Sequence, residues 1–211
     1  MMITLKNPEL LHIKESDGHI YFGADQEWYP TLWQRRAGCG PTTASQLILY
    51  FQNKGSIASL LNVQDKESMV RLMERVWTFV TPGIMGLHLI SQFTEGVDNY
   101  LKSISSSLAE QTLQIPRSEN KRPPFSQVVD FLVSSLQADS PVAFLNLSRG
   151  SLTNLDEWHW VTIVEVEQDT EDSDLYATIY DAGTYWKINM TQWYETTKRG
   201  GGLVSYRDRI S

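Results

Sequence analysis

The sequence lacks the features that mark several common classes of protein. It has a single cysteine, Cys39, so a scaffold of paired disulfides is excluded, and a lone thiol suits a reducing compartment. No stretch approaches the roughly 18 consecutive apolar residues of a membrane-spanning helix. The N-terminal residues have no apolar core of the length that a signal peptide needs. We therefore expect a cytoplasmic protein that does not enter membranes.

Basic residues are also in the minority. Lys and Arg total 18 against 25 Asp and Glu, the formal net charge is −7, and no long basic run occurs. A nucleic-acid partner needs a basic face to neutralise its phosphates, so we expect no nucleic-acid binding. The chain has 211 residues, of which 41% are hydrophobic. That is enough for one domain over residues 1–211 with a sizeable core.

Apolar spacing divides the chain into a helical first part and a β-rich second part. Helices are predicted from Thr42 to about Gly55 and over residues 66–80, 87–108 and 125–137. Strands are predicted at 142–147, 160–166, 176–180 and 185–190, with a possible edge strand at 204–206. Helices followed by a mainly antiparallel sheet indicate an α+β fold. The segment 56–138 is then a long helical insert.

Cys39 lies in the segment Gly38-Cys39-Gly40-Pro41, directly before the first predicted helix. Proline is favoured in the first turn of a helix, so the cysteine sits at or just before a helix N-terminus. The unpaired N–H groups and the dipole there favour a thiolate, which is the nucleophilic form. The alternative is a small buried hydrophobic residue, which is a common role for a free cysteine.

His159 is the candidate base among the four histidines, because it opens an apolar strand where a polar residue needs a reason. The next predicted strand ends at Asp181, and the acidic stretch 167–174 between the strands reads as a loop. A hairpin centred near residue 170 would pair His159 with Asp181. A histidine oriented by a carboxylate is what a cysteine nucleophile requires. Read separately, Asp181 would be a turn residue and His159 a satisfied strand-end histidine.

The Cys-Gly-Pro element, the His159-Trp160 strand and the strand ending at Asp181 together resemble the papain-like superfamily. The resemblance is closest to the bacteriocin-processing, or double-glycine, peptidases, and it spans about Trp33 to Asp181. It implies a helical part with the nucleophile at a helix N-terminus, packed on a C-terminal antiparallel sheet. It also implies an oxyanion hole formed by the Cys39 N–H and a preceding glutamine. Gln34 is the candidate for that glutamine, with Gln26 as a second choice.

The resulting hypothesis is a cysteine peptidase or amide hydrolase that acts through a thioester on a peptide or small amide. No metal and no organic cofactor is expected, since a lone cysteine and an isolated His159 cannot build a zinc cluster. Three alternatives stay open: an acyltransferase or transglutaminase on the same triad, a non-catalytic binding module, and a structural protein whose Cys, His and Asp never meet. Nothing in the sequence indicates an oligomeric state.

Overall fold

The computed structural model describes residues 1–168 and 173–208, in which a run of four α-helices precedes most of the strands of the main sheet. The α-helices are α1 (Leu32–Ala37), α2 (Cys39–Lys54), α3 (Lys66–Trp77), α4 (Ile90–Ser103), α5 (Phe125–Gln137) and α6 (Met190–Thr196). The strands are β1 (Met2–Thr4), β2 (His12–Lys14), β3 (Ile20–Phe22), β4 (Leu108–Ile115), β5 (Val142–Asn146), β6 (His159–Gln168), β7 (Leu175–Asp181), β8 (Thr184–Asn189) and β9 (Gly201–Asp208).

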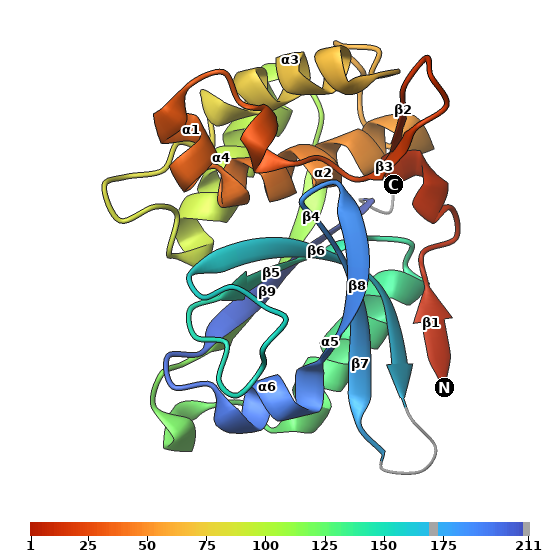
Figure 1. The fold of residues 1–211 in the computed structure, drawn as a ribbon. Helices are drawn as coiled ribbons and strands as arrows, with labels where there is room; N and C mark the ends of the chain where they lie inside the picture. Colours follow the sequence, from red (N-terminus) through yellow and green to blue (C-terminus); the bar gives the residue numbers. More distant parts are fainter. Residues whose placement is uncertain (169–172, 209–211) are drawn as a thin grey trace.

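A seven-stranded antiparallel sheet organises the molecule, with strand order β4-β9-β5-β6-β7-β8 and β1 paired with the far end of β6. A separate hairpin of β2 and β3 lies beside it. Helices α1 to α4 gather above the sheet in Figure 1, whereas α5 and α6 lie below. The predicted mixed architecture of helices and a mainly antiparallel sheet is therefore confirmed.

Both faces of the central strands are buried, and in β5 the period-two alternation of side chains divides them between two cores. In β5, Ala143 and Leu145 pack with α2, α3 and α4, whereas Val142 and Phe144 pack with α5. In β6, Trp160 packs in the core that contains α2, α3 and α4, whereas Val161 packs in the core that contains α5. A sheet covered on both faces explains why these strands read as continuous apolar runs.

The predicted helices are confirmed with small changes at their ends. Helix α2 ends where expected, because Gly55 adopts the left-handed conformation at φ 83° that favours glycine as a C-cap. Helix α4 is shorter than predicted, and His88 lies before it rather than on it. Helix α6 was not predicted.

Two predictions about the sheet are wrong. Strand β9 is internal and not an edge strand, because it pairs with both β4 and β5. The segment 56–138 is not wholly helical, since Leu108–Ile115 forms the edge strand β4. Strand β9 begins at Gly201, where a Cβ would lie 1.9 Å from the Leu145 carbonyl oxygen.

Candidate active site

Cys39 is the first residue of α2 and is partly buried. Gly38 serves as the N-cap without a side-chain hydrogen bond, and its carbonyl accepts the first helical bond from the Thr42 N–H at 2.8 Å. The amide of Cys39 therefore belongs to the first turn, where N–H groups have no helical acceptor. The sulfur thus lies at the positive end of a helix of 16 residues.

The two glycines beside Cys39 allow close contacts on either side of it. A Cβ on Gly38 would lie 2.3 Å from the Gln34 carbonyl oxygen, so only glycine lets α1 and α2 join this tightly. A Cβ on Gly40 would lie 2.6 Å from Cδ2 of Leu87. The Leu87 side chain therefore packs directly on the backbone of Gly40. This contact brings the segment 84–88 next to the cysteine.

Gly40→Ala should destabilise the protein by about 1–3 kcal/mol, the usual range for overpacking a filled site. The added methyl would have to push Leu87 away from α2. Denaturant unfolding measures the change. Gly83→Ala is the matched control, because a Cβ there meets nothing within 4 Å and its φ is not left-handed. Equal stability of the two variants would contradict the close packing of Leu87 on Gly40.

His159 and Asp181 are held together at one end of the β6–β7 hairpin. The Nε2–H of His159 donates to Oδ2 of Asp181 at 2.8 Å, and Oδ1 of the same carboxylate accepts from the Ala182 N–H at 3.0 Å. The chain bends sharply on both sides of the pair, since Trp158 and Ala182 have φ values of 59° and 49°. That left-handed region is uncommon for residues other than glycine and costly for a bulky one.

The predicted hairpin register is wrong by two residues, although the two side chains do meet. Thr162 pairs with Tyr180 and Ile163 with Ile179, so His159 and Asp181 are not directly opposed. Because the shift is even, both side chains stay on the same face and meet along a diagonal. A register shift at the bulge between Ile163 and Glu165 separates this end from the loop. The central part of the predicted acidic loop, 169–172, lies outside the described residues.

The ionisation of His159 reflects contacts with both of its partners. Burial acts to lower its pKa, but hydrogen bonds to Asp181 and Cys39, and the negative charges of both, outweigh burial and raise the pKa from 6.5 to about 10. Asp181 occupies Nε2, which leaves Nδ1 as the ring nitrogen available to another partner. Asp181 and Cys39 therefore both act on the charge of the same ring.

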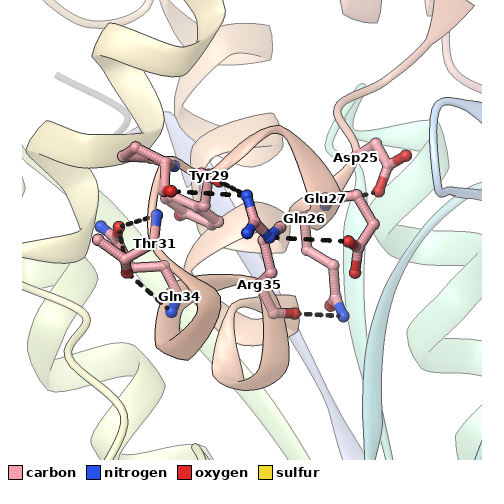
Figure 2. Close-up of polar contacts among 8 residues, drawn as sticks. Asp25, Gln26, Glu27, Tyr29, Thr31, Gln34 and Arg35 are labelled. Atoms are coloured by element: carbon pink, nitrogen blue, oxygen red, sulfur yellow. Dashed lines mark hydrogen bonds and ion pairs between the residues drawn. The ribbon is translucent and has the colours of Figure 1, made fainter.

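Gln34 lies in the first turn of α1 (Figure 2). Its Oε1 accepts from the N–H and the hydroxyl of Thr31, at 3.3 Å and 2.8 Å, and so completes a capping box. Within the described residues its Nε2 donates no hydrogen bond. The second choice, Gln26, uses its Nε2 to donate to the Arg35 carbonyl at 2.9 Å. Of the two amides, that of Gln34 is the one whose nitrogen donates no hydrogen bond within the described residues.

A surface pocket of about 300 Å³ opens at Cys39, and most of its wall was not predicted. The wall includes Trp33, Arg36, Met85, Leu87 and Trp158. Two tryptophans around the start of β6 hold the segment that carries Met85 and Leu87. The indole N–H of Trp158 donates to the Met85 carbonyl at 3.0 Å, and that of Trp160 donates to the Leu87 carbonyl at 2.6 Å.

The two tryptophans next to His159 therefore have different roles. Trp160 is buried and stacks on Phe93 in the core, whereas Trp158 is half-buried and lines the pocket. The turn residues Pro82, Gly83 and Gly86 mark the pocket-lining segment as a loop in the sequence. They carry no signal of where that loop docks.

Two features are absent from the part of the chain that the structure describes. It holds no group of three or more His, Cys, Asp or Glu side chains placed to bind a metal ion. Likewise, none of the helices formed by residues 1–168 and 173–208 is long and apolar enough to cross a membrane.

Comparison with known proteins supports a papain-like fold. The solved structure of a digestive procathepsin L 3 from the larval midgut of Tenebrio molitor is similar, with a TM-score of 0.50 and 9% sequence identity. The match covers 98% of this chain and 69% of that one. At this identity the likeness concerns the fold. No protein-family model matches the sequence, and a search of curated proteins finds no match. The predicted resemblance to the bacteriocin-processing branch is not confirmed.

Proposed function

We propose that the protein is a cysteine hydrolase of peptide or amide bonds, with Cys39 as nucleophile, His159 as acid and base, and Asp181 as the residue that orients His159. The observation that carries this proposal is the His159–Asp181 pair within electrostatic reach of Cys39, which begins α2. The ring donates to the Asp181 carboxylate at 2.8 Å, and Cys39 contributes to the raised pKa of the ring. A thiol nucleophile requires a base that is oriented in this way.

The proposed reaction is acyl transfer through a thioester. The thiolate of Cys39 attacks the carbonyl carbon and forms a C–S bond, and the carbonyl oxygen takes up the negative charge. The carbonyl re-forms as the C–N bond breaks, and the imidazolium of His159 gives its proton to the departing nitrogen. Neutral His159 then takes a proton from water, the hydroxide adds to the thioester carbonyl, and the C–S bond breaks. The carboxylic acid leaves, and the thiolate–imidazolium pair is restored.

The developing oxyanion needs donors, and we assign them to the Cys39 N–H and the free amide hydrogens of Gln34. Removing one such donor costs roughly 10²–10³ in rate. Gln34→Glu should show that loss, because it removes the amide donors but keeps an oxygen to accept from Thr31 in the capping box.

Gln34→Ala removes both the donor and the cap, so comparing the two variants separates catalysis from helix stability. Turnover is measured on the best amide substrate, and thermal unfolding checks the fold. If Gln34→Glu turns over like the wild type, the oxyanion donor lies elsewhere.

The experiment that tests the function itself is a survey of peptides, small amides and esters, analysed by mass spectrometry for cleavage and for an acyl group on Cys39. We expect hydrolysis that Cys39→Ala and His159→Ala abolish. Transfer of the acyl group to an added amine in preference to water would identify an acyltransferase on the same triad. Absence of any acyl-enzyme, together with an unreactive thiol, would favour a papain-like binding module.

A further inference from the structure

A second surface pocket, of about 200 Å³, adjoins the Cys39 pocket. Trp158 links the two. It lines the Cys39 pocket, its ring stacks on His88 at a centroid distance of 6.1 Å, and the Arg199 guanidinium lies 5.4 Å from its ring centre. Both His88 and Arg199 line the second pocket. Since Trp158 directly precedes His159, a group bound in the second pocket would lie close to the reacting atoms.

The second pocket is lined by basic side chains and by no carboxylate. Arg117 and Arg199 are exposed there beside His88, and no Asp or Glu is among the lining residues. Neither arginine forms an ion pair with any carboxylate of the described residues. Ile90 and Ser91, in the first turn of α4, add N–H groups that also favour an anion. In a chain of net charge −7, two unpaired arginines sharing one pocket stand out.

The Cys39 pocket differs in character from its neighbour. Trp33 is 49% exposed, Met85 60% and Ile84 97%, so apolar side chains form its rim. Arg36 is the charged member of its wall, and again no carboxylate lines it. Together the two pockets offer an apolar surface at the nucleophile and a cationic surface beyond Trp158.

We propose that the substrate is an anionic amide or peptide, with an apolar group in the Cys39 pocket and a carboxylate held by Arg117 and Arg199. This inference rests on the proposed function and adds to it the class of substrate. The carboxylate is either an acidic side chain or a free C-terminus, and both present the planar pair of oxygens that guanidinium groups bind. The overall negative charge of the chain therefore does not set the charge of the preferred substrate, because the charged side chains lining the two pockets are positive.

Protection of Cys39 from alkylation tests this proposal without requiring turnover. The probes are acetyl-Leu-Gly-Gln-amide, its Glu counterpart, and the same Gln peptide with a free C-terminus. For each we measure the concentration that halves the rate of Cys39 alkylation by iodoacetamide. We expect at least one acidic peptide to protect at a roughly fivefold lower concentration than the neutral peptide, about the effect of one exposed ion pair. Added salt should reduce that advantage.

The variants identify the source of the advantage. It should disappear in the double variant Arg117→Gln/Arg199→Gln and persist in Arg71→Gln, a control that removes one arginine charge from α3, where Arg71 pairs with Glu67. Which acidic peptide protects tells a side-chain carboxylate from a terminal one. Equal protection by all three peptides, or an advantage that survives the double variant, overturns the proposal. The proposed function is tested separately by the His159 dependence of alkylation without peptide.

Discussion

Replacing His159 with alanine should slow the alkylation of Cys39 by iodoacetamide at about pH 6 by roughly tenfold or more. An ordinary thiol, with a pKa of about 8.5, is only about 0.3% thiolate at that pH. A thiolate held by an imidazolium is present in far larger amount, up to about 300-fold. Its lower basicity makes each thiolate less nucleophilic, which leaves a net gain of the order of tenfold. In the variant that gain is lost.

The chain is well suited to this measurement, because Cys39 is its only cysteine and mass spectrometry therefore reports one site. Rates are measured from about pH 4 to pH 10. His19→Ala is the matched control, since His19 is exposed on the N-terminal hairpin and its ring contacts Tyr21. A wild-type rate that rises only near pH 8.5, and that His159→Ala leaves unchanged, would mean that no thiolate–imidazolium pair exists.

The second large effect concerns the charge of His159. In the wild type we expect its pKa near 10, so the ring stays protonated throughout the neutral range. Asp181→Asn should lower that pKa by more than one unit, because the negative charge is lost while a hydrogen-bond acceptor is kept. Asp181→Ala should lower it further, because burial, which favours the neutral ring, then acts against the Cys39 contact alone.

Titration of the histidine ring carbons by NMR measures these values. The His159 signal is assigned as the one missing from His159→Ala, and Asp130→Asn controls for the change in net charge because Asp130 is exposed on α5. A lower pKa means that less imidazolium is available near pH 8 to donate a proton to a leaving nitrogen. Activity of the Asp181 variants should therefore fall first on the alkaline side. A His159 pKa near 6.5 in all three proteins would mean that Asp181 does not act on the ring.

Local features of the sequence were sufficient to predict helix ends, where a residue acts on its neighbours along the chain. Pro41 lies in the first turn of α2 and Gly55 ends the helix. Each has a backbone preference that acts without any distant contact. Thr31 and Gln34 form a capping box at the T-x-x-Q spacing that is typical of helix starts. That spacing is readable in the sequence alone, because both partners of the cap lie within one helical turn.

Pairing between distant segments is where sequence patterns were weakest. Strand β4 alternates only loosely, with Glu and Gln on its outer face, and it pairs with β9 about ninety residues later along the chain. The first pair after the loop is Gln168 with Leu175, so the loop is centred later than residue 170, and the bulge near Val164 then shifts the register by one. A count from residue 170 therefore missed the register at His159 by two. Strand pairing and register are decided by packing across the sheet, and a short stretch of sequence carries little information about that packing.

The residues of the proposed reaction could be named from residue types, because a cysteine before a helix, a histidine opening a strand and an aspartate closing the next form a small set of possibilities. The surroundings of that chemistry were not. The loop that carries Met85 reaches Cys39 only because two indoles and the bare backbone of Gly40 hold it there. Arg117 and Arg199 come from loops 82 positions apart and share a pocket only in the folded chain. Side chains that meet through tertiary packing share no spacing in the sequence, so substrate preference is decided by the three-dimensional structure.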